Sequence, residues 1–354
     1  MGEGRNLVGV DIGSNSIKVC EIQERGGERN LVRFACHTLP NGAIVEGHII
    51  NSGAVVDGLK ALFNKQRRRA VALQVSGHHV IIKNFTTTIK PLSELKGDGS
   101  WELEQHIPFP LSEVEFDVHV VQRRMEQRQM DVLLVAAKKA EISDLLAIVQ
   151  EAKLFPVVID VDACAIFNVL EVAYGPRLMN ETVAVVHVGA SLTTVIVVSH
   201  GVPAFTRTLI QGGQHLTEVI QRWVHVGVVD ADAYMGGGGA GWGVVPPQVP
   251  TVIEQTCDQW AIEVQKSLDY HFATTGEKRA SKVFLCGGSA QLRPFQRAVE
   301  ARVGVQVDVL DPRRILRIGP KVPGAQELDK CFMQAIVAVG LALRKERERV
   351  HDSN

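Results

Sequence analysis

The sequence predicts an α/β protein in which two related halves enclose one binding site, and three segments support this prediction. Residues 7–19 read as an apolar strand, a Gly-Ser turn and a second strand, and residues 183–198 repeat that plan. In the third segment, the apolar strand 282–286 runs into a Gly-Gly-Ser turn and then a helix. The turn residues are Gly13, Ser14, Asn15 and Ser16 in the first segment, Gly189, Ala190 and Ser191 in the second, and Gly287, Gly288 and Ser289 in the third.

Each turn offers small residues, hydroxyl groups and exposed backbone N–H groups, which together can wrap a phosphate. A single Asp-x-Gly-Ser sequence is most often an ordinary hairpin turn. Three glycine turns of this kind in one chain are not expected by coincidence, so a shared phosphate site is the better explanation. Lys18 can bring an ammonium group back to the same phosphates. Asp11 would repel a phosphate directly, so its expected role is to hold Mg²⁺ through ordered water. The pattern therefore favours one nucleotide held between the two halves.

Two further features are candidates for nucleotide contacts, each with a simpler alternative. Gly212 and Gly213 precede a helix, and backbone N–H groups at a helix start suit an anion, although a tight turn explains the glycines equally well. In the predicted helix 252–270, Glu263 and Lys266 lie three residues apart and share one face. This pair is either a ribose contact or a surface ion pair.

The composition favours a globular protein of two domains. The length of 354 residues exceeds one ordinary core, and 45% hydrophobic with 22% charged residues is typical of a soluble, folded chain. The 38 basic and 39 acidic residues give a net charge of −1, so no global field favours nucleic acid. The basic runs 67–69 and 344–349 are interpreted as solvated surface. Six cysteines without C-x-x-C spacing are interpreted as reduced, buried thiols.

Motifs of other nucleotide and catalytic sites are missing from the sequence. It contains no GxxxxGK(S/T) P-loop, no HExxH and no GxSxG. Residues 236–241 satisfy GxGxxG, but residues 242–250 do not read as a helix, so a flexible loop is predicted. No run approaches the about 20 apolar residues that span a bilayer, and the N-terminus does not read as a signal peptide. We therefore expect a soluble protein that meets a membrane only through partners.

The order of predicted elements divides the chain into two domains and a small insert. A helix is expected at 52–65 with Ser52 as its N-cap, and another at 92–106, which Pro108 ends. A final helix is expected at 329–349. The expected boundaries are 1–180 for the first domain, about 86–137 for the insert within it, 181–328 for the second domain, and 329–354 for a C-terminal segment that packs back on the first domain.

The two hairpins, Asp160 at a strand end before a helix, and residues 285–289 resemble the actin/Hsp70/FtsA superfamily of nucleotide-binding proteins. The likeness narrows at residues 101–111, WELEQHIPFPL, which are similar to the E-x-E-x-x-I-P-F-P motif of the PilM family of actin-like type IV pilus assembly proteins. The resemblance covers nearly the whole chain. Other similar stretches are 132–138, 153–160 and 339–344.

This resemblance implies an actin-like ATPase fold, with two RNase H-like domains flanking a nucleotide cleft and an FtsA-like inserted subdomain. It also implies a cytoplasmic protein that binds ATP and Mg²⁺ and reaches the inner membrane only through partners. The implied partner is the N-terminal cytoplasmic peptide of PilN, bound between the core and the insert. PilO would be reached through PilN, and the pilus motor ATPases and the platform protein PilC would be further partners. A ring-like homo-oligomer is compatible with the resemblance.

The resemblance assigns Asp11, Asp160 and His187 to the catalytic part of the site, and His187 departs from the superfamily pattern. There the second hairpin usually begins with an aspartate, as in D-x-G-x-x-x-T, whereas here His187 precedes Gly189 and Thr193. A carboxylate would help to order Mg²⁺ and the attacking water, and a neutral imidazole holds Mg²⁺ poorly. We therefore expect ATP to bind with weak or absent hydrolysis and to act mainly as a clamp between the halves.

Two other functions stay open at this point. A small-molecule kinase of the same superfamily would need a carboxylate base facing an acceptor pocket, and His187 and the pilus-like insert argue against it. An FtsA-like division protein would end in an amphipathic membrane helix. Residues 344–354 lack the apolar face that such a helix requires.

Overall fold

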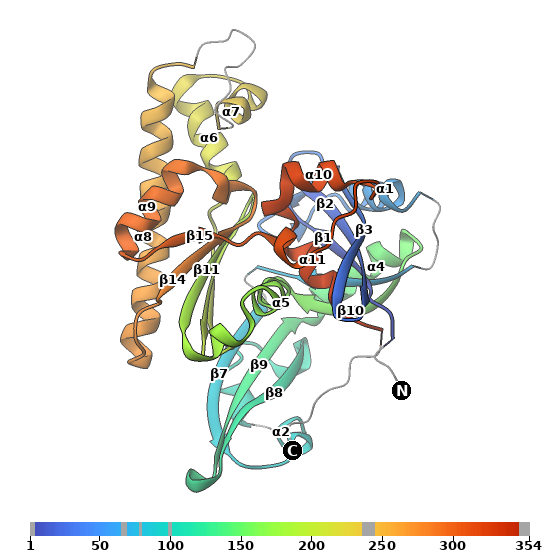
Figure 1. Cartoon of the computed structure of the whole chain (residues 1–354), viewed down its shortest axis with the longest axis vertical. Helices are drawn as coiled ribbons and strands as arrows, with labels where there is room; N and C mark the ends of the chain where they lie inside the picture. Colours follow the sequence, from blue (N-terminus) through green and yellow to red (C-terminus); the bar gives the residue numbers. More distant parts are fainter. Residues whose placement is uncertain (1–3, 65–68, 78–79, 98–100, 236–244, 347–354) are drawn as a thin grey trace.

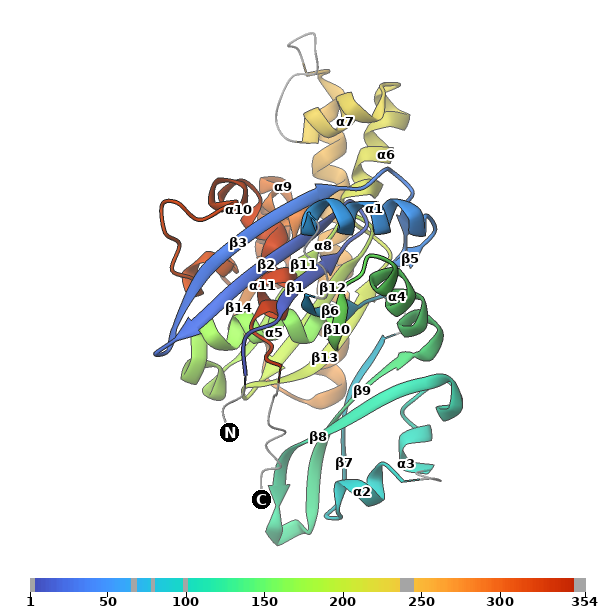
Figure 2. The same ribbon diagram turned by 90° about the vertical axis from the view of Figure 1, so that its right-hand side faces the viewer.

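Two five-stranded sheets of the same topology form the body of the computed structural model (Figures 1 and 2). The structure describes residues 4–64, 69–77, 80–97, 101–235 and 245–346. One sheet has the order β3-β2-β1-β6-β10 and the other β13-β12-β11-β14-β15. In each, three antiparallel strands are followed by two parallel ones. This repeated order agrees with the two related halves that the hairpins predict.

Both predicted hairpins are present. The strands of the first sheet are β1 (Val8–Ile12), β2 (Ser16–Arg25), β3 (Glu28–Thr38), β6 (Ala70–Val75) and β10 (Phe155–Val161). Those of the second sheet are β11 (Thr182–Val188), β12 (Thr193–Ser199), β13 (Val202–Leu209), β14 (Lys282–Cys286) and β15 (Val307–Val309). The strands β1, β2, β11 and β12 are buried along most of their length, as expected where both faces of a sheet are covered.

Helices and sheets alternate in layers around three apolar cores. The helices α1 (Ser52–Phe63) and α4 (Lys139–Glu151) cover the outer face of the first sheet. The helices α6 (Gly213–Val224), α8 (Gln248–Thr275) and α9 (Arg293–Val303) cover the outer face of the second, with α7 (Val228–Met235) beside α6. The helix α5 (Asp162–Tyr174) lies between the sheets. Within the described ranges, no helix is both long and apolar enough to cross a membrane.

The start of α1 corrects one sequence expectation. Asn51, and not Ser52, is the N-cap residue, because its side-chain oxygen accepts a hydrogen bond from the Ala54 N–H at 3.0 Å. Asn51 and Ser52 are both residue types that commonly serve as an N-cap, so the sequence does not distinguish them. The small hairpin of β4 (Ile44–Val45) and β5 (His48–Ile49) precedes this helix.

The single C-terminal helix predicted for 329–349 is not continuous. Instead, α10 (Ala325–Cys331), a 3₁₀ turn at Phe332–Ala335 and α11 (Ile336–Ala342) follow one another. Two glycines let α11 pack closely between the sheets. A Cβ at Gly9 would lie 2.1 Å from the Ala338 carbonyl oxygen, and one at Gly340 would lie 1.9 Å from that of Ala165. The end of the predicted helix, 347–349, lies outside the described residues.

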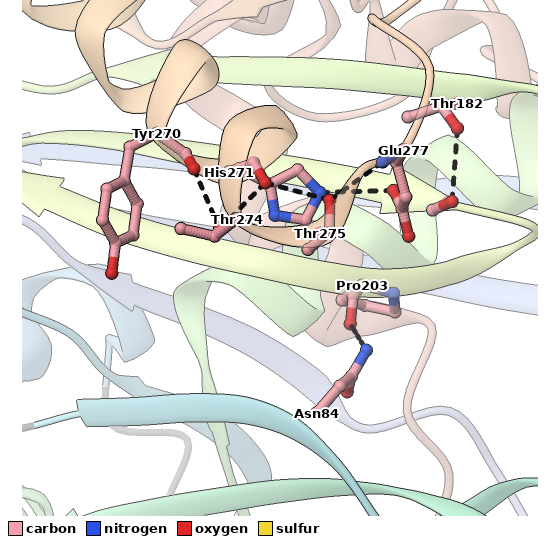
Figure 3. A network of polar contacts seen from close by, with 9 residues as sticks. Asn84, Thr182, Pro203, Tyr270, His271, Thr274, Thr275 and Glu277 are labelled. Carbon is pink, nitrogen blue, oxygen red and sulfur yellow. Dashed lines mark hydrogen bonds and ion pairs between the residues drawn. The ribbon is translucent and has the colours of Figure 1, made fainter.

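A three-stranded sheet projects from the first half, as Figure 2 shows. Its order is β7-β9-β8, with β7 (Val80–Thr88), β8 (Val114–Arg124) and β9 (Gln129–Lys138). The expected helix at 92–106 is replaced by α2 (Leu92–Leu95) and α3 (Trp101–Glu104), which cover one face of this sheet. The strand β7 also reaches the second half, because the Asn84 side chain donates to the Pro203 carbonyl on β13 at 2.9 Å (Figure 3).

Candidate functional site

The three predicted turns meet at one cavity of about 580 Å³ between the two halves. From the first half it is lined by Asp11, Gly13, Ser14, Asn15, Ser16, Lys18, Gln74 and Asp162. From the second half it is lined by His187, Gly189, Ala190, Ser191, Thr194, Gly213, Gly288 and Ser289. Its far end is lined by Thr217, Gln221, Val228, Asp232 and Met235. A volume of this size is typical of a small-ligand pocket.

The first hairpin turn presents donors toward this cavity. The Gly13 N–H donates to the Ser16 carbonyl at 3.1 Å, which closes the turn. Within the described part of the chain, the N–H groups of Ser14 and Asn15 have no backbone acceptor. The Lys18 ammonium lies over the same corner, because a Cβ at Gly13 would sit 3.1 Å from Lys18 Nζ. Two N–H groups and an ammonium around a glycine corner suit an anion.

The Asp11 carboxylate is buried and held from two sides. Lys18 Nζ lies 3.2 Å from Asp11 Oδ2, and Gln74 Nε2 donates to Asp11 Oδ1 at 2.9 Å. Both partners are themselves at least nine-tenths buried. The carboxylate is therefore fixed in position at the mouth of the first hairpin.

The second hairpin is bound to the start of α6 by its own carbonyl groups. The N–H groups of Gly213 and Gln214 donate to the Gly189 and Ala190 carbonyls at 3.0 and 2.8 Å. A Cβ at Gly212 would lie 2.4 Å from the Ala190 carbonyl oxygen, so only glycine fits there. These two helix N–H groups are thus not open to an anion. Of the two alternatives for these glycines, the structure at Gly212 agrees with the tight turn. Gly213 nevertheless lines the cavity.

Several residues predicted for the site lie outside the cavity lining. The Thr193 hydroxyl donates to the Gln211 carbonyl at 2.7 Å and so ties the second hairpin to the segment before α6. Gly287 has a φ of +92°, and a Cβ there would lie 2.3 Å from the Val188 carbonyl oxygen, so it shapes the third turn. Glu263 and Lys266 pair with each other at 2.7 Å on α8. Of the two alternatives for that pair, the structure shows the surface ion pair.

Asp160 does not line the cavity, whereas Asp162, which was not predicted as a site residue, does. Asp160 is the penultimate residue of β10 and its Oδ2 lies 3.4 Å from Arg344 Nε, whereas Asp162 begins α5 and lines the cavity. The Thr194 hydroxyl donates to Asp162 Oδ2 at 3.3 Å. Burial, aided by the nearby Asp11 and Asp160 charges, raises the pKa of Asp162 to about 6. The two aspartates are two residues apart, so only the exact end of the strand distinguishes them.

His187 occupies the cavity as a neutral imidazole. Burial lowers its pKa to about 4, and the Lys18 charge acts in the same direction, while Asp11 opposes both. A neutral ring cannot replace the carboxylate that usually orders a metal ion at this position.

Magnesium would find two carboxylates in this cavity. Asp11 and Asp162 supply oxygen donors of the kind that Mg²⁺ prefers. Among the residues that the structure describes, no group of three His, Cys, Asp or Glu side chains could hold a metal by itself. The donor set therefore fits an ion that keeps most of its ligands as water and phosphate oxygens.

A second cavity, of about 420 Å³, adjoins the first on the side of α4. Its lining includes the apolar residues Ile49, Leu145 and Ile148, of which the last two are largely buried, and three carboxylates of α4. The carboxylates are Glu141, Asp144 and Glu151. Residues that line both cavities are Ile12, Ile44, Gly47, Gln74 and Ser76.

Comparison with solved structures identifies the class of protein. MreB 5 of Spiroplasma citri, solved with AMPPNP, matches 96% of this chain and 95% of its own at 12% identity, with a TM-score of 0.54. The ethanolamine utilization protein EutJ of Carboxydothermus hydrogenoformans matches 96% and 89% at 15% identity, with a TM-score of 0.56. The chain has the actin-like ATPase fold, which confirms the predicted fold class.

A family model described as type IV pilus assembly protein PilM matches residues 9–346. The chain therefore belongs to the PilM family of type IV pilus assembly proteins. A solved PilM-PilN type IV pilus biogenesis complex is similar over 97% of this chain and 99% of the solved chain, at 26% identity and a TM-score of 0.82. The resemblance inferred from the IPFP segment is confirmed.

Proposed function

We propose that this protein binds one molecule of ATP with Mg²⁺ in the cavity between its halves and, in that form, docks PilN during type IV pilus assembly. The observation that carries the proposal is the convergence of three glycine turns, from both halves, on one cavity. The triphosphate would lie at the first turn, among the Ser14 and Asn15 N–H groups and the Lys18 ammonium. The base and ribose would take the far end, near Thr217 and Met235.

Bound magnesium would neutralise part of the phosphate charge. Asp11 and Asp162 would hold the ion's hydration shell, and Lys18 and Gln74 would keep Asp11 in place. The neutral His187 contributes no metal ligand, so we propose that hydrolysis is slow and that ATP mainly joins the halves. Ligand at 100 times its dissociation constant stabilises a folded protein by about 2.7 kcal/mol, which suffices to hold a cleft closed.

Calorimetric titration of the purified protein with ATP and Mg²⁺ tests this function. We expect one site per chain and a thermal stabilisation that rises with ATP concentration. A phosphate-release assay on the same sample tests whether ATP joins the two halves without being rapidly hydrolysed. Fast magnesium-dependent hydrolysis would refute the clamp, and the lack of any ATP binding would refute the function.

The second cavity is the seat that we propose for the PilN peptide. Its three carboxylates on α4, with the half-buried Ile49 in the same lining, fit an extended segment that bears basic side chains and an apolar one. It lies beside the junction of the core with the insert, because α4 directly follows β9, although the residues that line it belong to the core. PilO, the motor ATPases and PilC would join through the assembled complex.

Binding of a labelled PilN N-terminal peptide, followed by fluorescence anisotropy with and without ATP, tests this seat. Asp144→Asn and Leu145→Asn are expected to weaken peptide binding by about tenfold or more each. Glu126→Gln, on the exposed turn between β8 and β9, is the matched control and should have no effect. Equal peptide affinity in all four proteins would place the peptide elsewhere.

One observation favours a second candidate function, that of a small-molecule kinase. A kinase needs a carboxylate base in its cavity, and Asp162 supplies one with a raised pKa. Screening small alcohols and carboxylates for phosphate transfer from ATP tests this alternative, and we expect no product.

A further inference from the structure

Gln74 is a buried polar residue at the cavity, and its side-chain oxygen has no role in the proposed nucleotide contacts. It lies near the end of β6 and is 8% exposed. It lines the same cavity as Asp11 and Asp162. Glutamine is mostly exposed in proteins, so a buried glutamine in a cavity calls for a physical reason.

The orientation of the Gln74 amide is fixed by its neighbour. The amide nitrogen donates to Asp11 Oδ1 at 2.9 Å, while Lys18 takes the other carboxylate oxygen. A flipped amide would set its oxygen against a carboxylate oxygen, which is repulsive, so the nitrogen must face Asp11. The amide oxygen, Gln74 Oε1, then points away from Asp11.

Gln74 Oε1 has no hydrogen-bond partner in the described part of the chain. A buried carbonyl oxygen without a donor costs free energy, so a group at this site is expected to donate to it. Asp11 and Asp162 cannot do so when ionised, because carboxylates only accept. A water molecule held by a cation near Asp11 can donate, and its protons are made more acidic by the cation.

We propose that Gln74 is a positioning residue of the nucleotide site, whose amide nitrogen holds Asp11 and whose amide oxygen would accept a hydrogen bond from a water molecule in the hydration shell of magnesium. This inference rests on the proposed binding of ATP with Mg²⁺. It explains why an amide stands here, since the group must donate on one side and accept on the other. This role of the amide oxygen requires the magnesium ion, because the ionised phosphate oxygens of ATP accept hydrogen bonds and do not donate them.

The test compares ATP affinity with excess Mg²⁺ and with EDTA, by calorimetry, in wild type and in Gln74→Met. Methionine keeps the volume and removes both polar groups. We expect affinity for the magnesium complex to fall about tenfold, while affinity in EDTA changes by about twofold or less. A purely structural role would lower both affinities together. The matched control is Gln306→Met, because Gln306 also donates to a carboxylate, Asp308, at 3.0 Å, but on the surface.

A second variant keeps the test decisive if Gln74→Met does not fold. Gln74→Glu retains an acceptor oxygen but sets a second carboxylate beside Asp11 in place of the amide donor. The added negative charge attracts a divalent cation, so the ratio of ATP affinity with Mg²⁺ to ATP affinity in EDTA should rise above that of wild type. If wild type binds ATP more tightly with Mg²⁺ and the ratio is unchanged in the variants, the inference on Gln74 fails alone. If wild type binds no ATP, the proposed function fails first.

Discussion

Lys18 pairs with Asp11 across the first hairpin, with 3.2 Å between Nζ and Oδ2 and both side chains buried. The two residues face one another because β1 and β2 are in register, with Asp11 opposite Lys18. The hairpin thereby positions one cation for phosphate and one carboxylate for a hydrated metal ion. Both roles depend on the glycine corner between them.

Replacing Asp11 with alanine should weaken nucleotide binding. The change removes the proposed anchor of the magnesium hydration shell and frees Lys18 from its partner. If affinity falls about tenfold, stabilisation by ATP at 100 times the wild-type dissociation constant drops from about 2.7 to about 1.4 kcal/mol. Thermal unfolding with and without ATP measures this, and an unchanged ATP-dependent shift would remove Asp11 from the site.

Asp162 and His187 should give stability opposite dependences on pH in the same window. The raised pKa of Asp162, about 6 against an ordinary 3.8, means that the folded state holds the extra proton between about pH 4 and pH 6. Stability from this group therefore falls as pH rises. The lowered pKa of His187, about 4 against 6.5, means that the unfolded state holds the extra proton, so stability rises with pH.

In wild type the two slopes largely offset each other. Asp162→Asn should leave a free energy of unfolding that rises between about pH 4 and pH 6.5, and His187→Gln one that falls, each by up to about 3 kcal/mol. Urea unfolding across this range measures both. Parallel curves for all three proteins would show that neither group titrates as described.

Alanine at Gly287 should destabilise the fold far more than alanine at Gly288. Gly287 has φ +92° and ψ 158°, which only glycine adopts readily, and a Cβ would meet the Val188 backbone at 2.3 Å. We expect a loss of about 3 kcal/mol or more. At Gly288 the nearest atom is the flexible Gln334 side chain at 3.0 Å, so a cost of about 1 kcal/mol is expected. Equal losses in urea unfolding would contradict this account of the third turn.

Glu263→Gln and Lys266→Met should leave ATP affinity unchanged, because this ion pair lies on α8 outside the cavity lining. Lys18→Met is the informative comparison, since it removes the ammonium over the first hairpin. Calorimetry should show a clear loss for Lys18→Met alone. A loss of ATP affinity in Lys266→Met would instead support the ribose contact that the sequence left open.

The two glutamates of the WELE segment should behave differently. Glu102 accepts from Lys90 Nζ at 2.6 Å and from the Thr87 hydroxyl at 2.7 Å, and these contacts lower its pKa. Glu104 is exposed. Glu102→Ala should loosen the packing of α3 on β7 and raise hydrogen exchange in the insert, whereas Glu104→Ala should not. Matching exchange in both variants would argue against a structural role for Glu102.

The hairpins could be predicted because their information is local. An apolar strand, a glycine corner and a second strand are contiguous in sequence, and two of them have the same form. Asp160 was predicted in place of Asp162 because the two lie two residues apart at the junction of β10 and α5, and the end of the strand cannot be located to the residue from sequence. In the structure, Asp160 lies near Arg344, far along the chain. Glu263 and Lys266 were ambiguous for a related reason. Shared spacing on a helix does not say which face meets the cavity.

Two further features had no local signal. Gln74 is an unremarkable polar residue in a strand until the fold brings Asp11 against its amide. The C-terminal segment reads as one apolar helix, but α11 must turn to fit between α5 and β1, where Gly9 and Gly340 leave room. Such tertiary constraints override helix periodicity.

A crystal structure of the protein with manganese and a non-hydrolysable ATP analogue tests the central claim most directly. The account predicts one triphosphate among Gly13, Gly189 and Gly288, with the anomalous peak of the manganese beside Asp11. Analogue density on another surface, or a manganese peak away from Asp11, would contradict it.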